Sequence, residues 1–212
     1  MAVYDLEEQE QLDALKAWWN QYGRLVIVAV CAFLITIVLF LGWRSYRQQQ
    51  SAGAAQLYTT LKTAVEEKDA KKIRDAGGAI VEKFPSTGYA ALAALALAKA
   101  NFESGDKAGA KVQLQWVIEH AREEEMRDVA RLRLAAVLLD EKDHAQALKL
   151  AETKHAEAFD ALYADLKGDI LVAQGNRAEA RAAYQAALDK SDARSAFRNL
   201  VQLKLDALGD AK

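Results

Sequence analysis

The sequence predicts an all-α protein in which one N-terminal transmembrane helix is followed by a solenoid of short helical hairpins. Three observations support this fold class. Eighteen consecutive residues, Leu25 to Gly42, carry no charge. The 162 residues from Ser51 onward are rich in the helix formers Ala, Leu, Lys, Glu and Gln, and the alternation typical of strands is nearly absent. In that part of the chain, turn-like dipeptides recur at nearly regular spacing.

The apolar run is long enough to cross a bilayer. At the rise of an α-helix it spans about 27 Å, close to the thickness of the hydrocarbon layer. Aromatic side chains with a polar edge flank both ends, as expected at the two membrane interfaces. These residues are Trp18, Trp19 and Tyr22 before the run, and Trp43 and Tyr46 after it. We therefore expect a membrane anchor over residues 24–46.

Two other interpretations of the run are a cleaved export signal and a buried core helix. An export signal has an apolar core of about 7–15 residues behind a short basic start. Here five acidic residues precede the run, so an uncleaved anchor is favoured. A buried helix in a soluble domain usually keeps a polar face, which this run lacks.

The basic residues near the run do not decide its orientation. Within about twenty residues, Lys16 and Arg24 lie on the amino side, and Arg44, Arg47 and Lys62 lie on the carboxyl side. The positive-inside rule therefore leaves the orientation open.

Residues 1–23 form an acidic tail with an amphipathic stripe. Leu12, Leu15, Trp19 and Tyr22 recur at spacings of three and four. Such a stripe is suited to lying along lipid headgroups or to meeting a partner, and a tail that simply leads into the anchor is an equally good interpretation. The predicted domains are thus the tail 1–23, the span 24–46 and a repeat domain 47–212.

Four dipeptides mark the repeats: Lys68-Asp69, Gly105-Asp106, Lys142-Asp143 and Gly175-Asn176. The Asp or Asn residues are 37, 37 and 33 positions apart. The unit is a helix, a tight turn and a second helix, and we expect the Asp or Asn to cap the second helix. Four residues after each Asp or Asn lies Ile73, Ala110, Ala147 or Ala180, at a position where two helices pack closely.

These units resemble the tetratricopeptide repeat. The last unit, ADLKGDILVAQGNRAEARAAYQAAL, has small and aromatic residues at the packing positions of that repeat, and the first unit matches least. We predict that the repeat-packing residues are Gly105, Ala110, Ala147, Gly168, Gly175, Ala180, Tyr184 and Ala187. Residues 191–208 are expected to form the solvating cap helix that solenoids need. An antiparallel bundle without repeat geometry is the alternative.

The expected core consists of Leu92, Leu95, Leu97, Phe102, Leu132, Leu134, Leu138 and Leu139. The run Tyr89 to Ala100 is expected to be a helix packed between two neighbours. In repeat folds the first helix of each pair usually lines the concave face, which binds peptide segments. The exposed side chains within 89–102, 127–139 and 161–173 are therefore the candidate binding residues.

Catalysis has no support in the sequence. The three histidines lack ligand spacing, and neither a metalloprotease, hydrolase or P-loop motif nor a dinucleotide fingerprint occurs. The net charge of −2 indicates no nucleic-acid partner. We expect no catalytic, cofactor or metal site, and no cofactor. The only cysteine, Cys31, lies inside the apolar run, so disulfides are not expected in the repeat domain.

The whole arrangement resembles the ancillary subunit of the bacterial Sec translocon. The resemblance rests on the acidic start MAVYDLEEQEQLDALKAWWNQYG, the span ending LGWRSYR, and the blocks TGYAALAALALAKANF, RLRLAAVLLDEKDHAQALK and ADLKGDILVAQGNRAEARAAYQAAL. It implies a single-span protein of the bacterial inner membrane with its amino terminus in the cytoplasm and its repeats in the periplasm.

As partners, the resemblance implies the translocon channel and a membrane-anchored periplasmic chaperone that resembles prolyl isomerases. As function, it implies an adaptor that helps pass exported polypeptides to periplasmic chaperones. Two alternatives stay open: negative regulation of an envelope stress response through the cytoplasmic tail, and a general envelope scaffold.

Overall fold

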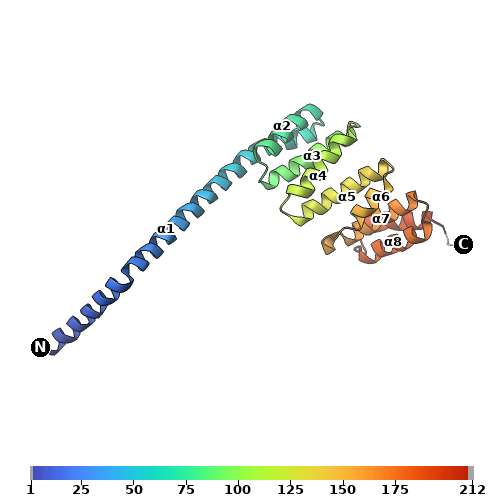
Figure 1. Ribbon diagram of the computed structural model, residues 1–212. Coiled ribbons are helices and arrows are strands. Elements are labelled where there is room, and N and C mark those ends of the chain that lie inside the picture. Colours follow the sequence, from blue (N-terminus) through green and yellow to red (C-terminus); the bar gives the residue numbers. More distant parts are fainter. Residues whose placement is uncertain (1, 210–212) are drawn as a thin grey trace. The chain divides into compact units, whose positions relative to one another are not determined.

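The computed structural model describes the backbone of residues 2–209 and the side chains of residues 10–209 (Figure 1). The described part is helical and contains no strand, which confirms the predicted fold class. The chain divides into two compact units, Met1–Gln50 and Ser51–Lys212, and the boundary falls inside the first helix. The helices are α1 (Ala2–Glu66), α2 (Ala70–Lys83), α3 (Gly88–Glu103), α4 (Lys107–His120), α5 (Glu124–Asp140), α6 (His144–Ala151), the 3₁₀ turn η1 (Glu157–Phe159), α7 (Asp160–Ala173), α8 (Arg177–Lys190) and α9 (Ala196–Ala207).

The first unit is a single helical segment. From Glu10 onward nearly all of its side chains are exposed, including the ion pair between Lys16 Nζ and Asp13 Oδ1 at 3.2 Å. The side chains of the acidic residues Asp5, Glu7 and Glu8 in the predicted tail lie outside the described residues. The predicted boundaries of the tail and span therefore stay predictions.

The second unit consists of helical hairpins that follow one another along the chain, each helix from α2 onward packing on the next (Figure 1). The last turns of α1 form the first hairpin with α2, because Leu61 and Ala64 share an apolar cluster with Ile73 and Ile80. The hairpins α3–α4, α5–α6 and α7–α8 come next, and α9 packs on α8.

All four hairpins are closed by the same turn. The residue before the cap has a positive φ in each case: Lys68 at 56°, Gly105 at 86°, Lys142 at 64° and Gly175 at 83°. This left-handed backbone favours glycine, so the two lysines adopt it at a steric cost. The same backbone conformation therefore recurs in all four turns. A repeat fold requires such recurrence, whereas an irregular bundle would not produce it.

Three of the four predicted caps form. Asp69 accepts hydrogen bonds from the backbone N–H groups of Lys71 and Lys72, and Asp106 and Asp143 each accept one from the residue three positions on. The prediction is wrong for Asn176, whose side chain makes no cap bond to α8. Asn and Asp cap helices about equally well in general, so residue type alone does not account for this difference.

The repeat domain is held together by close contact between small and aliphatic side chains. α3 contributes Ala94, Leu95 and Ala98 to one apolar cluster, and Ala93 and Leu97 to another. It is therefore packed between two neighbours, as predicted. Among the expected core residues, Leu95, Leu97, Leu134 and Leu138 are buried. Leu92, Leu132 and Leu139 are half-buried.

Two expectations for helix ends are corrected. Phe102 does not lie in the core: it is in the last turn of α3, is 41% exposed and belongs to none of the three apolar clusters. The cap helix is shorter than 191–208, since α9 begins at Ala196. Its start is set by Ser195, whose side-chain oxygen accepts a hydrogen bond from the N–H of Arg198.

Candidate binding surfaces

One helix of the described residues is long and apolar enough to span a bilayer, and none of its most apolar eighteen-residue window is buried. The side chains of Leu25, Phe33 and Leu39 are each more than 60% exposed. The hydroxyl of Thr36 donates to the carbonyl of Ala32 at 2.8 Å, so this polar group is satisfied within its own helix. In water such a surface would be strongly unfavourable, whereas in lipid it is matched to its surroundings.

The five predicted interface residues lie exposed at the two ends of the apolar run. On the amino side, the Trp18 ring lies 6.4 Å from that of Trp19 and 5.9 Å from that of Tyr22. On the carboxyl side, Tyr46 is 58% exposed, and the guanidinium of Arg47 lies 4.8 Å from the centre of the Trp43 ring. These contacts show amphipathic rings at both ends of the run. Their position at the two membrane interfaces stays a prediction.

The predicted repeat-packing residues fall into two groups in the structure. Gly105 and Gly175 occupy the left-handed turn positions. The others lie at helix contacts, where Ala110, Ala147, Ala180 and Ala187 are all fully buried and Gly168 and Tyr184 are almost so.

Gly168 of α7 and Tyr184 of α8 pack directly against each other. A Cβ atom at Gly168 would lie only 2.4 Å from the Tyr184 ring, so the absence of a side chain on α7 admits the tyrosine of α8. The Tyr184 hydroxyl donates to Asp169 at 2.8 Å, and burial raises the pKa of this tyrosine above its ordinary value. The phenol therefore stays neutral and acts as a hydrogen-bond donor.

A hollow of about 850 Å³ lies between the second helices of two neighbouring hairpins, α4 and α6. Leu134 and Leu138 of α5 lie in it, and both are buried, so they form its apolar base. Val112, which is 65% exposed, and Trp116 contribute apolar surface from α4. Because α6 ends at Ala151, it covers less of α4 and α5 than a second helix of fourteen residues such as α4 or α8 would.

This hollow only partly matches the expected binding face. Of the three predicted ranges, 127–139 contributes Leu134 and Leu138, whereas 89–102 and 161–173 contribute no residue to it. Most of the lining comes from second helices, on which no binding residue is predicted from the sequence. Neither Gly nor Pro follows Ala151 before Asp160, so the sequence carried no signal that α6 is short.

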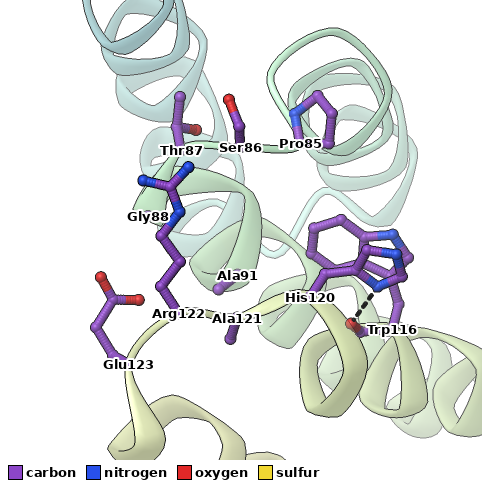
Figure 2. Close-up of a pocket in the computed structure, with 10 residues that line it drawn as sticks. All are labelled: Pro85, Ser86, Thr87, Gly88, Ala91, Trp116, His120, Ala121, Arg122 and Glu123. Carbon is purple, nitrogen blue, oxygen red and sulfur yellow. Dashed lines mark hydrogen bonds between the residues drawn. The ribbon is translucent and has the colours of Figure 1, made fainter. Parts of the chain in front are cut away.

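A much smaller notch lies beside the hollow and shares Trp116 with it. Figure 2 shows the notch between the segment from Pro85 to Gly88 and the segment from Ala121 to Glu123. The His120 ring stacks on Trp116 with ring centres 4.7 Å apart, and its Nδ1 lies 2.9 Å from the Trp116 carbonyl oxygen. The enclosed space is about 10 Å³, which is room for about one water molecule, so the notch does not hold a larger ligand.

A buried polar cluster joins α5 to the segment before α7. Asp128 is fully buried and accepts hydrogen bonds from Arg131 at 2.7 Å, from the Tyr163 hydroxyl at 3.1 Å and from the N–H of Ala156 at 3.0 Å. Burial raises the pKa of Tyr163 above its ordinary value, with the Asp128 carboxylate adding to the effect. His155 stacks on the Tyr163 ring with centres 3.8 Å apart. Every contact here is internal, so the cluster is structural; sequence patterns offered no signal for it.

A second charged cluster fixes α9 to α7. Lys204 Nζ lies 2.8 Å from Asp165 Oδ1 and 2.8 Å from Asp169 Oδ2. Burial works to lower the pKa of Lys204, but the hydrogen bonds to the two carboxylates outweigh it, and the pKa lies above its ordinary value. Burial also raises the pKa of Asp165, against the opposing effect of Lys204. The amine is thus occupied by its own chain.

Comparison with known proteins gives a consistent result over nearly the whole chain. Residues 16–210 match the family model of the tetratricopeptide repeat-like domain. The chain is 30% identical over 211 residues to the ancillary SecYEG translocon subunit of Escherichia coli (strain K12), covering 98% of this chain and 99% of that protein. It is 31% identical over 193 residues to the protein of the same name in Haemophilus influenzae, covering 87% and 90%. For the Neisseria gonorrhoeae protein of that name the identity is 31% over 208 residues, covering 96% and 98%.

An exposed apolar helix followed by four hairpins with a common turn defines a tetratricopeptide-like protein with an N-terminal helix suited to span a bilayer. The relatives match this chain over the apolar helix as well as over the repeats. The chain belongs to the family of ancillary SecYEG translocon subunits.

Proposed function

We propose that the protein is a non-enzymatic, membrane-anchored adaptor that associates with the Sec translocon channel and helps pass exported polypeptides to periplasmic chaperones. The observation that carries this proposal is the likeness to ancillary SecYEG translocon subunits over 98% of the chain. It covers the apolar helix and the repeats together, so both parts of the adaptor are included.

In this proposal the chain crosses the bacterial inner membrane once. Residues 1–23 lie in the cytoplasm, 24–46 span the bilayer, and 47–212 form the periplasmic repeat domain. A reporter fused after Lys212 tests the orientation: one that is active only in the periplasm is expected to give signal. A signal from a reporter that is active only in the cytoplasm would contradict the proposed orientation.

The hollow between α4 and α6 is the surface that we propose for polypeptide contact. The exposed Val112 side chain and the half-buried Trp116 offer apolar surface above its apolar base, and charged residues such as Lys111 and Lys149 surround it. An apolar centre with a polar rim is typical of protein-binding surfaces. The partners proposed here are the channel and a membrane-anchored chaperone that resembles prolyl isomerases.

Crosslinking in native membranes tests this function. A photo-crosslinking residue at Val112 is expected to link the protein to chaperone or to polypeptides in export, and one at the exposed Gln185 of α8 provides the matched control. If native membranes yielded crosslinks to neither channel subunits nor a periplasmic chaperone, the adaptor function would be wrong. Equal crosslinking yields at the two positions would argue against the hollow as the contact surface and would leave the adaptor function standing.

Regulation through the tail is a second candidate, favoured by the exposed stripe that includes Leu12 and Leu15 at 54% and 60%. Deleting residues 1–23 while keeping the anchor and repeats separates the two functions. Loss of stress regulation with intact translocon association would favour the regulator.

A further inference from the structure

The last helix leaves an apolar stripe uncovered. α9 buries Val201 and Leu205 against Tyr184, Ala187 and Leu188 of α8. A different face of α9 carries Ala196, Leu200, Leu203 and Ala207, which follow one another at three or four residues and therefore line up along the helix. All four are exposed, Leu200 at 51% and Leu203 at 66%.

This stripe differs from the other exposed apolar side chains of the repeat domain. Val65, Phe102 and Val112 lie singly on three helices, and Leu162 and Val172 lie ten positions apart on α7. Single exposed apolar residues are normal on protein surfaces. Two large ones that are neighbours on one helix face, extended by alanines at both ends, form a seam.

The protein's own contacts hold α9 in place without covering the seam. Arg177 of α8 donates to the Leu208 carbonyl at 3.2 Å, Arg198 donates to the Leu188 carbonyl, and Lys204 is bound to Asp165 and Asp169 of α7. The seam is therefore presented by a fixed helix, and ordering it for an interaction carries little entropic cost.

The two ends of α9 differ in net charge. Arg194 and Arg198 lie at its amino end, against the single acidic residue Asp192 before the cap, so this end is net basic. At the carboxyl end, Lys204 is bound to Asp165 and Asp169, Arg177 of α8 donates to the Leu208 carbonyl, and Asp206 adds a third acidic group. Three carboxylates against two basic groups leave this end net acidic.

A second α9 in antiparallel orientation would compensate both ends. The seam reads alanine, leucine, leucine, alanine in either direction. Antiparallel pairing brings Leu200 against Leu203 of the second copy and Ala196 against Ala207 of the second copy. It also brings the acidic carboxyl end of one helix beside the basic amino end of the other, whereas a parallel pair would set like ends together.

We propose that two copies of this chain associate in the membrane through antiparallel pairing of their α9 helices. This goes beyond the proposed function and depends on it only for the membrane anchor. Four seam residues per copy bury much less than the roughly 1,200 Å² of a stable soluble complex. Anchoring in one bilayer raises the effective concentration of the second copy, so a small interface suffices there and dissociates on dilution in detergent.

Disulfide crosslinking of the full-length chain in native membranes tests the pairing. Cys31, the only native cysteine, is first replaced by Ser. Two differently tagged copies are then co-expressed, one with Leu200→Cys and one with Leu203→Cys, and oxidised. The mixed dimer is expected to exceed, several-fold, the dimer formed by Gln185→Cys copies, whose position is exposed on α8 and lies outside the hollow.

Two further comparisons determine the outcome. Adding Ala196→Glu to both copies places an acidic group beside Asp206 of the second copy and is expected to reduce the mixed dimer to the Gln185→Cys level. A mixed yield no higher than that control from the outset overturns the proposal. So does a higher yield from two Leu203→Cys copies, which indicates parallel pairing, or a disulfide to a different protein in place of the dimer. None of these outcomes depends on translocon association, so failure of the pairing and failure of the adaptor function are distinguishable.

Discussion

The apolar run Leu25–Gly42 and the first part of α3, residues 88–98, are both uncharged helical segments, but their surroundings are opposite. In the apolar helix, the most apolar window has no buried residue. In α3, eight residues are buried, among them Ala90, Ala94 and Ala98. The first is rich in Val, Ile, Leu and Phe, whereas the second is rich in Ala.

The difference shows that side-chain size, and not the absence of charge, separates the two helices. Large side chains maximise the apolar surface offered to lipid, whose chains adapt to any shape. Alanines allow two neighbouring helices to approach α3 at once, because each contact needs little room. A charge should therefore disrupt either helix, whereas added volume should disrupt only α3.

The largest effect is expected from the one buried charge of the repeat domain, among the residues that the structure describes. Asp128→Ala leaves the Tyr163 hydroxyl and the Ala156 N–H without their carboxylate acceptor, and it leaves the Arg131 guanidinium, which is only 14% exposed, with Glu124 as its remaining ion-pair partner. Each buried donor without an acceptor costs about 1–3 kcal/mol, and together with the weakened ion pair we expect a loss of about 3–5 kcal/mol. Urea unfolding of the full chain in detergent, followed by circular dichroism, measures the loss.

Asp140→Ala is the matched control, because Asp140 lies on the same helix and forms an exposed ion pair with Lys107. An exposed pair contributes about 1 kcal/mol or less. Equal losses for the two variants would show that the buried cluster does not stabilise the repeat domain.

The next effect tests the apolar helix. Leu34 lies near its middle and is 54% exposed, so Leu34→Arg removes no packing within the chain. A charge at the centre of a span costs about 2.5–3.5 kcal/mol of insertion free energy. We expect a larger share of the protein in the soluble fraction after alkaline extraction, with Leu34→Ala retained. Retention of both variants to the same extent would contradict a bilayer span.

Added volume distinguishes the two helices directly. Ala94 is fully buried. Ala94→Leu therefore forces the apolar cluster around it apart, at a cost of about 1–3 kcal/mol. The corresponding change in the apolar helix, Ala29→Leu, should leave both unfolding and membrane retention unchanged. The same urea measurement checks α3, and a neutral Ala94→Leu would show that α3 has spare room.

The fold was predictable because it depends on features that recur in the sequence. The four turns, the apolar residue four positions after the Asp or Asn of each turn, and the long apolar run all follow patterns with known physical causes. Phe102 was placed wrongly because its hydrophobicity predicts burial, whereas burial at a helix end depends on tertiary contacts that hydrophobicity does not determine. The Asn176 cap failed because composition does not determine whether one particular oxygen meets an N–H group.

The candidate binding surface was less predictable. The hollow exists because α6 is short, and its lining combines residues of α4, α5 and α6 that are up to about forty positions apart. No periodic pattern joins Val112 to Leu150. The Asp128 cluster is also nonlocal, since its partners Ala156 and Tyr163 lie 28 and 35 positions away.

The smallest effect concerns the turns, where two lysines occupy a backbone that suits glycine. Lys142 has a φ of 64°, in the position that Gly105 and Gly175 fill in neighbouring hairpins. Lys142→Gly removes about 1–2 kcal/mol of steric strain from the left-handed backbone of the folded state. Glycine also gives the unfolded chain more conformational entropy, which lowers the stability by about 0.5–1 kcal/mol. We therefore expect a net increase in the free energy of unfolding of about 1 kcal/mol or less. Ala182→Gly, at an exposed position in the middle of α8, provides the contrast, because glycine there should cost about 1 kcal/mol. If both variants lowered the urea midpoint equally, the turn of the third hairpin would not share the backbone of its neighbours.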